Sequence, residues 1–119
     1  MKINVIITAG GTSQRYGMEN KLFAPCKDSC VVVESIKPFL TFEQVSKVIV
    51  AIHPSYSDEL LNALEIAHIE DNRIALTQGG TTRTQTVKHG IRAIEDDCDY
   101  VIVHDGARPY VTTALINSV

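Results

Sequence analysis

The sequence contains no hydrophobic run long enough to cross a bilayer. Its longest apolar stretches, such as residues 31–33 and 48–52, fall far short of the roughly 20 residues that a membrane helix needs. The N-terminal stretch MKINVIITAGG also lacks the long apolar region and the small-residue cleavage site of a signal peptide. These absences predict a cytoplasmic protein that does not contact a membrane.

Positive charge is not in excess either. The chain has 11 lysines and arginines against 14 aspartates and glutamates, which gives a net charge of −3 at pH 7. This balance argues against a broad basic face for nucleic acid. A phosphate ligand would therefore depend on a few well-placed cations.

Cysteine is scarce, with one C-x3-C pair and no second pair at zinc-ligand spacing. We expect Cys26, Cys30 and Cys98 to be reduced thiols. A small redox domain that uses Cys26 and Cys30 is an alternative, which the absence of C-x-x-C spacing disfavours. With 119 residues, 45% of them hydrophobic, the chain instead has the size and composition of one soluble globular domain.

Strand and helix patterns alternate along the chain. Runs rich in valine and isoleucine predict strands at residues 3–8, 48–53, 74–77 and 100–104. Apolar residues at helical spacing predict helices at residues 33–40, 57–69 and 82–94. This alternation is typical of a parallel sheet with helices on both faces. The first, second and fourth strands are nearly continuous apolar runs, so we expect them to be covered on both faces.

Local residues indicate where the helices begin and bend. Ser57, which two acidic residues follow, is the expected N-cap of the second helix, and Thr81 or Thr82 that of the third. Pro38 should kink the first helix.

Ligands of such sheets bind beyond the carboxyl ends of the strands. The first loop there, AGGTSQRYGMENKLFAP, has Gly10 and Gly11 for close approach of backbone N–H groups to phosphate, with Arg15 and Lys21 as cations. It is neither a Walker A loop nor a G-x-G-x-x-G loop. A tight turn with solvated surface charges is the alternative.

The second loop, QGGTTRTQTVKHG, places Gly79 and Gly80 before a helix whose first turn holds Thr82 and Thr86. These hydroxyls and amides could bind a ribose or a base edge. Taken alone, the loop is better explained as a glycine turn with an ordinary helix cap. Two such loops at one sheet edge favour a ligand site.

The third loop, VHDGARPYV, has Asp105 at the end of an apolar strand, followed by Gly106. A carboxylate there could bind magnesium or a ribose. Arg108 could form an ion pair with Asp105, and the two roles are compatible. His104 is a less suitable base for this site, because neighbouring strand residues point to opposite faces.

Together these loops resemble those of the 2-C-methyl-D-erythritol 4-phosphate cytidylyltransferase family. The matching stretches are AGGTSQRYG with Lys21, GGTTRTQTV and VHDGARP, in the family's order and at about its spacing. The resemblance covers the whole chain but only the first half of a usual member. It implies an α/β fold of the three-layer, Rossmann-like nucleotidyltransferase type with a mostly parallel sheet. Residues 1–119 would be its N-terminal, nucleotide-binding part.

The resemblance also implies roles for residues of the first loop. Ala9, Gly10 and Gly11 would line the triphosphate of CTP. Arg15 and Lys21 would neutralise it and serve as the catalytic cations.

Residues of the other two loops receive roles in the same way. Gly80 and Thr86 would help to hold the cytosine and ribose, and Asp105 would bind Mg²⁺. Gly106 and Arg108 would shape the nucleotide pocket.

The implied reaction transfers CMP from CTP to 2-C-methyl-D-erythritol 4-phosphate and releases pyrophosphate, a step of non-mevalonate isoprenoid synthesis. A phosphate monoester, with a second pKa of about 6, is already largely dianionic at neutral pH. No general base is required, which suits a sequence without a convincing catalytic triad. The full-length protein would be a homodimer.

Three departures from the family pattern leave the acceptor open. Thr86 stands where serine is common, Gly106 where alanine is usual, and Leu22 where glutamine is frequent. Ribitol 5-phosphate cytidylyltransferases share the AGGT-type first loop. Ribitol 5-phosphate as acceptor and a module that binds nucleotide without catalysis therefore stand as alternatives.

Lys21→Ala tests the electrostatic role of the first loop. Loss of one preorganised donor should lower turnover of the complete enzyme by about 10²- to 10³-fold. Steady-state pyrophosphate release measures the effect, and unchanged turnover would refute the assignment.

Overall fold

A computed structural model describes residues 2–9, 22–80, 82–94 and 98–106. The elements follow in the order β1 (Ile3–Ala9), β2 (Pro25–Cys26), β3 (Ser29–Cys30), α1 (Val31–Leu40), β4 (Val45–Ile52), the short 3-10 helix η3 (Pro54–Tyr56), α2 (Ser57–Ile66), β5 (Ile74–Gln78), α3 (Arg83–Arg92) and β6 (Tyr100–Asp105). The predicted alternation of strand and helix is thus confirmed.

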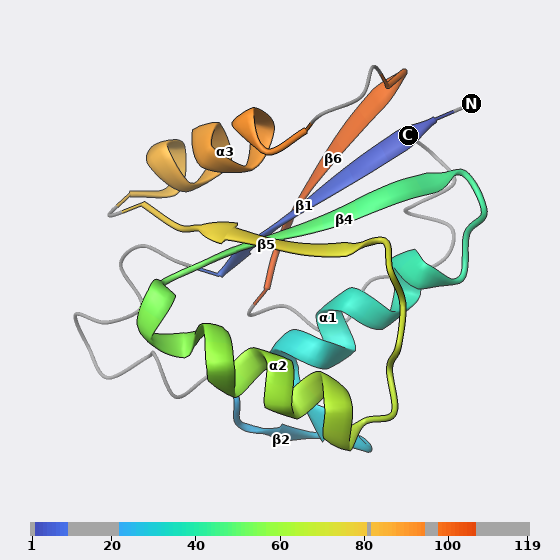
Figure 1. The fold of residues 1–119 in the computed structure, drawn as a ribbon, viewed down its shortest axis with the longest axis vertical. Coiled ribbons are helices and arrows are strands. Elements are labelled where there is room, and N and C mark those ends of the chain that lie inside the picture. The colour runs from blue at the N-terminus through green and yellow to red at the C-terminus, as the bar shows by residue number, and fades with distance from the viewer. Residues whose placement is uncertain (1, 10–21, 81, 95–97, 107–119) are drawn as a thin grey trace.

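The four longer strands form one sheet in the order β5-β4-β1-β6, and every pairing is parallel (Figure 1). From β1 the chain moves outward through β4 to β5, and then crosses to the other side of β1 to form β6. The direction of winding therefore reverses between β1 and β6. In parallel sheets, the crevice beside such a switch point is where ligands bind.

Helices cover both faces of the sheet, which confirms the predicted three layers. Helices α1 and α2 lie on one face and α3 lies on the other (Figure 1). On the first face, Val5 and Ile7 of β1 are fully buried in a cluster that includes Ile36 and Phe39 of α1. On the second face, α3 approaches β1 so closely that a Cβ at Gly90 would lie 2.5 Å from Ile6 Cγ2.

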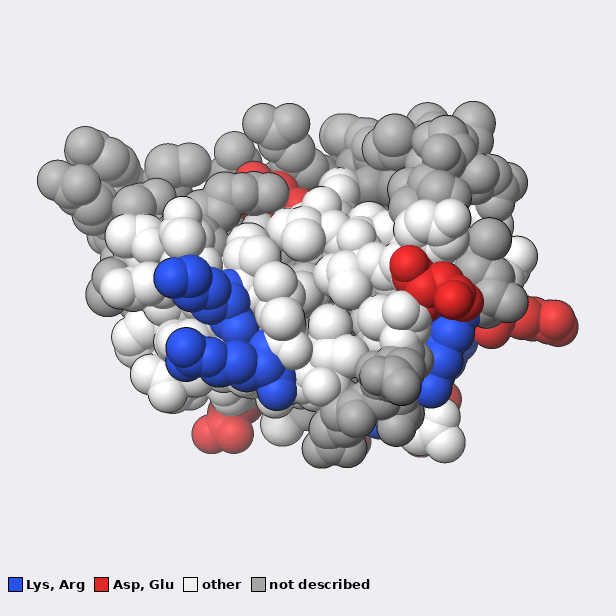
Figure 2. Space-filling view, turned by 90° about the horizontal axis from the view of Figure 1, so that it is seen from above, with Lys and Arg blue, Asp and Glu red and all other residues white. Residues whose placement is uncertain are grey.

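The prediction that the fourth strand is covered on both faces is wrong. Although β1 and β4 are almost wholly buried, Tyr100, Val101 and Val103 of β6 are 45%, 41% and 37% exposed. The reason is position, because β6 pairs only with β1 in the described sheet and therefore lies at its edge. Figure 2, which views the molecule from the α3 side of the sheet, shows a broad area without Lys, Arg, Asp or Glu.

The helix boundaries differ from the prediction at several points. Thr82 caps α3 as predicted, because its side chain accepts from the backbone N–H of Gln85. Ser57 does not cap α2, since η3 runs into that helix and makes Tyr56 the N-cap residue. Helix α1 continues for two residues beyond Pro38.

The β2–β3 hairpin was not predicted, because two-residue strands leave no periodic pattern. It contains Cys26 and Cys30, which are free thiols like Cys98, as expected. Burial raises the pKa of the Cys30 thiol, which counts further against a redox function. None of the helices that the structure describes is long and apolar enough to cross a membrane.

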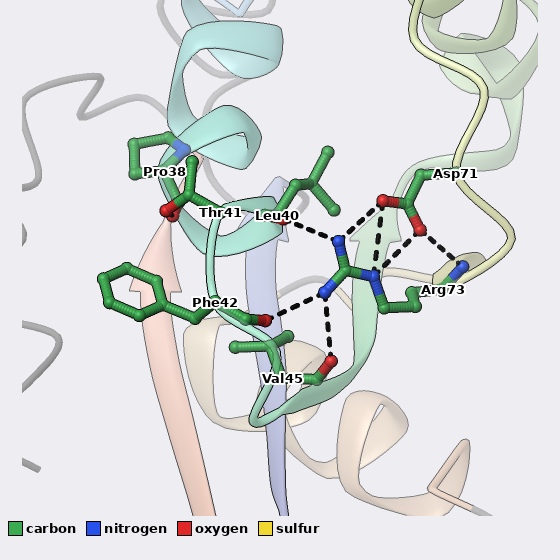
Figure 3. Close-up of polar contacts among 7 residues, drawn as sticks. All are labelled: Pro38, Leu40, Thr41, Phe42, Val45, Asp71 and Arg73. Carbon is green, nitrogen blue, oxygen red and sulfur yellow. Dashed lines mark hydrogen bonds and ion pairs between the residues drawn. The ribbon is translucent and has the colours of Figure 1, made fainter.

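Arg73 lies at the amino ends of the strands, opposite their carboxyl ends (Figure 3). Its guanidinium donates to the carbonyl of Leu40 at 2.6 Å, where α1 ends, and to those of Phe42 and Val45 at 2.9 and 3.2 Å. The Asp71 carboxylate accepts from Nε and Nη2 of the same side chain. One side chain thus joins the end of α1, the turn before β4 and the segment before β5.

Arg73→Lys should lower the free energy of unfolding by about 2 kcal/mol, because one ammonium cannot reproduce the planar set of donors. Hydrogen bonds from the Arg73 side chain hold the pKa of Asp71 below its usual value. The contribution of the ionised Asp71 carboxylate to the free energy of unfolding is therefore present above about pH 4. It is lost as the pH falls through the lowered pKa.

Urea denaturation at pH 7 and pH 2 measures both effects. The difference in unfolding free energy between wild type and Asp71→Asn should shrink on acidification. Arg92→Lys on the exposed end of α3 is the matched control and should change stability little. Equal stability of the Arg73→Lys and Arg92→Lys variants would contradict the role of Arg73.

Candidate nucleotide-binding site

The carboxyl ends of all four strands meet at one edge of the sheet. Register pairs Ala9 of β1 with Ile52 of β4, and Ile52 with Gln78 of β5. On the other side of β1, Thr8 pairs with Asp105. Because neighbouring strands are about 4.8 Å apart, Gln78 lies about 10 Å from Ala9 across the sheet. The three predicted loops therefore adjoin the same edge.

The β6 end lies directly against the β1 end at the switch point. The Gly106 N–H donates to the Thr8 carbonyl at 2.9 Å. A Cβ on Gly106 would lie 3.1 Å from Ile7 Cγ2 and 3.2 Å from the Thr8 carbonyl oxygen, so the turn is closely packed. Asp105 is thereby held beside the point where the first glycine loop begins.

His104 and Asp105 diverge, as strand alternation predicts. The His104 ring packs against Phe39 of α1, with the ring centroids 5.5 Å apart. Asp105 accordingly belongs to the opposite face, which α3 covers. His104 is therefore part of the packing under the sheet rather than a base beside Asp105.

The β5 loop is held by hydrogen bonds from both of its ends. The Gly79 N–H donates to the Ile52 carbonyl at 2.9 Å, and the Gly80 N–H donates to Thr86 Oγ1 at 3.0 Å. A Cβ on Gly80 would overlap the Cβ of Gln85, so only glycine fits there without movement. The loop backbone thus lies tightly against the first turn of α3.

Thr86 is 1% exposed and its hydroxyl is engaged inside the loop. Besides accepting from Gly80, Oγ1 donates to the Thr82 carbonyl at 2.9 Å. These contacts order the loop, and a direct contact of Thr86 with cytosine or ribose stays a prediction.

The structure places five of the predicted site residues at this edge, namely Ala9, Gly80, Thr86, Asp105 and Gly106. The other five lie outside the described residues, namely Gly10, Gly11, Arg15, Lys21 and Arg108. Leu22, at the position where the family resemblance implies that glutamine is frequent, is buried in the hydrophobic core.

Sequence reasoning missed two residues that hold the loops. His89 Nδ1 lies 2.7 Å from the Gln78 carbonyl oxygen, at the start of the β5 loop. Ser35 of α1 reaches the Gly106 carbonyl. His89 follows Thr86 by three residues on one helix face, so helical spacing could have revealed it. No local sequence pattern connects Ser35 to Gly106, because the two residues are 71 positions apart.

One further carboxylate, Glu34, lies in the first turn of α1. Burial alone raises its pKa, but hydrogen bonds from Lys37 and Ser29 outweigh that effect, and the pKa lies below its usual value. Glu34 therefore remains ionised at neutral pH and is engaged with Lys37 and Ser29.

Comparison with known proteins agrees with this geometry. Residues 3–119 match the family model described as IspD, 2-C-methyl-D-erythritol 4-phosphate cytidylyltransferase. The chain belongs to this family. The resemblance inferred from the three loops and the predicted fold are both confirmed.

Curated members of the cytidylyltransferase family align with nearly the whole chain. The 2-C-methyl-D-erythritol 4-phosphate cytidylyltransferase of Carboxydothermus hydrogenoformans is 35% identical over 92% of this chain and 46% of its own length. That of Bacillus pumilus is 34% identical over 93% of this chain and 48% of its own. The chain thus spans about half the length of these relatives.

Solved structures show the same fold. 4-Diphosphocytidyl-2C-methyl-D-erythritol synthase from Anaerococcus prevotii superposes with a TM-score of 0.80 at 24% identity, over 98% of this chain and 48% of that one. The Francisella tularensis cytidylyltransferase gives a TM-score of 0.75, also at 24% identity, over 98% of this chain and 49% of that one.

Thr86→Val tests whether the hydroxyl orders the β5 loop. Valine has the same shape but leaves the Gly80 N–H without this acceptor, so we expect a loss of about 1–3 kcal/mol of stability. Urea denaturation gives the total loss, and amide exchange at Gly80 locates it. Thr86→Ser keeps the hydroxyl and should keep Gly80 protected, whereas equal exchange in both variants would contradict this role.

Proposed function

We propose that this chain forms the CTP-binding part of an enzyme that transfers CMP to 2-C-methyl-D-erythritol 4-phosphate and releases pyrophosphate. The observation that supports it best is the meeting of β1 and β6 at the switch point, because these strands lead into the AGG and DGAR motifs. The family match over residues 3–119 supports the same proposal.

In this proposal the loop after β1 binds the triphosphate. Backbone N–H groups of Gly10 and Gly11 approach the phosphate oxygens, and Ala9 marks where the strand ends beneath them. Arg15 and Lys21 neutralise charge that grows on the leaving pyrophosphate. The acceptor phosphate is already dianionic, so bringing two anions together is the main barrier, and fixed cations lower it.

Mg²⁺ is the cofactor that fits this edge. Magnesium commonly takes one or two protein carboxylates, with substrate phosphates completing its coordination, and Asp105 offers one carboxylate beside the triphosphate loop. The described residues include no group of three His, Cys, Asp or Glu that would form a metal cage of protein ligands alone. When bound, the ion neutralises phosphate charge.

The β5 loop receives the nucleoside end of CTP. The strand β5, which leads into Gly80, lies two strand spacings from β1, and this suits the separation of a base from its triphosphate. Because the Thr86 hydroxyl is engaged within the loop, we infer that loop backbone groups contact the base and ribose. As the family resemblance implies, Gly106 and Arg108 would shape the nucleotide pocket.

For the whole protein we propose a homodimer, as the family resemblance implies, and a location in the cytoplasm. Its partners are CTP and a sugar-alcohol phosphate rather than nucleic acid, which the net charge of −3 supports.

Two measurements test the proposed function. The purified chain should bind CTP in a Mg²⁺-dependent manner in a calorimetric titration. The natural gene product that contains this sequence should release pyrophosphate from CTP when 2-C-methyl-D-erythritol 4-phosphate is added.

Asp105→Asn should raise the Mg²⁺ concentration needed for half-maximal CTP binding, because it removes the anionic ligand.

The outcomes separate the alternatives. Faster pyrophosphate release with ribitol 5-phosphate would identify that compound as the acceptor instead. Binding of CTP without turnover of either acceptor would indicate a nucleotide-binding module. Failure to bind CTP at millimolar Mg²⁺ would overturn the proposal altogether.

A further inference from the structure

A serine on α1 makes a direct contact with the turn that follows β6. Ser35 is fully buried, with 0% of its surface exposed, and its Oγ lies 2.9 Å from the Gly106 carbonyl oxygen. The two residues are 71 positions apart in the chain. The contact therefore exists only in the folded protein.

The hydroxyl has one proton and two carbonyls within reach. Ser35 Oγ is also 2.9 Å from the carbonyl of Val31, one helical turn earlier. A serine inside a helix commonly donates to that position, where a backbone N–H already donates, so the bond is locally redundant. The bond to the Gly106 carbonyl is the one that joins two separate elements. A single hydroxyl proton shared between the Val31 and Gly106 carbonyls serves both acceptors.

The Gly106 turn is consequently held from two directions. Its N–H donates to Thr8 of β1, and its carbonyl accepts from Ser35 of α1. A Cβ added at Gly106 would lie only 3.1 Å from Ile7 and 3.2 Å from Thr8, so the turn has little room to shift toward β1. Asp105 immediately precedes this fixed peptide.

We propose that Ser35 is a positioning residue for Asp105. Its hydroxyl fixes the Gly106 carbonyl and so sets how the Asp105 carboxylate is presented beside the β1 loop. Ser35 itself is enclosed beneath the edge and does not touch the ligand. The cation-binding consequence rests on the proposed function, whereas the ordering of the turn does not.

Ser35→Ala in the 119-residue chain tests the ordering of the turn. Amide hydrogen exchange should show Gly106 protection reduced by about fivefold, the effect of one lost hydrogen bond. Protection of Gly79, which donates to Ile52, should be unchanged. Thr41→Ala is the matched control, because it removes another hydroxyl bond to the backbone of α1, from the C-cap residue Thr41 to Pro38, in which Gly106 takes no part.

The second measurement is the Mg²⁺ concentration that gives half-maximal CTP binding. It should rise several-fold in Ser35→Ala and stay at the wild-type value in Thr41→Ala. Ser35→Thr restores a hydroxyl and should recover both readouts. If Ser35→Ala does not fold, Ser35→Cys keeps nearly the same volume with a much weaker donor and takes its place.

Unchanged Gly106 protection in the alanine or cysteine variant would overturn the inference. Reduced protection with wild-type Mg²⁺ dependence would also overturn it, provided that Asp105→Asn changes that dependence. If Asp105→Asn has no effect, the magnesium role in the proposed function fails, and Gly106 protection alone then decides whether Ser35 orders the turn.

Discussion

The central place of β1 is the constraint on which the rest of this structure depends. The strand pairs with β4 on one side and β6 on the other, and its residues are buried on both faces. Each buried valine or isoleucine contributes about 1.5–3 kcal/mol relative to an exposed one. A slip by one residue would exchange the two faces of this strand and disturb its packing on both of them.

Because β1 is fixed, so is the point at which the first loop begins. Ala9 ends the strand beside Ile52 and next to the β6 end, and both neighbouring pairings are parallel. The order β5-β4-β1-β6 then places the switch point at β1, where two of the three motifs begin. In the proposed function, the ligand site is thus supported by the most completely buried strand of the described sheet.

In the described parts of the β5 and β6 loops, backbone groups and hydroxyls hold the chain. Thr86 holds Gly80, and Ser35 and Thr8 hold Gly106. Neutral donors and acceptors fix the backbone without adding charge that would compete for phosphate or cation. The ion pair of Arg73 with Asp71 lies at the opposite end of the strands, where it serves stability.

The sequence by itself determined the order of the four long strands and three helices, the parallel sheet, the three loops and the family, because apolar periodicity and short motifs are local properties. It did not determine that β6 lies at the edge of the described sheet with Val101 and Val103 exposed, since a strand's neighbours are chosen by the whole sheet. Nor did it indicate the β2–β3 hairpin, or the turn of η3 that displaced Ser57 from the cap of α2. Only the tertiary structure decided that the Thr86 hydroxyl accepts from Gly80 and that the Ser35 hydroxyl donates to Gly106. Hydrogen bonds between residues that are distant in the chain depend on packing, which no local sequence pattern records.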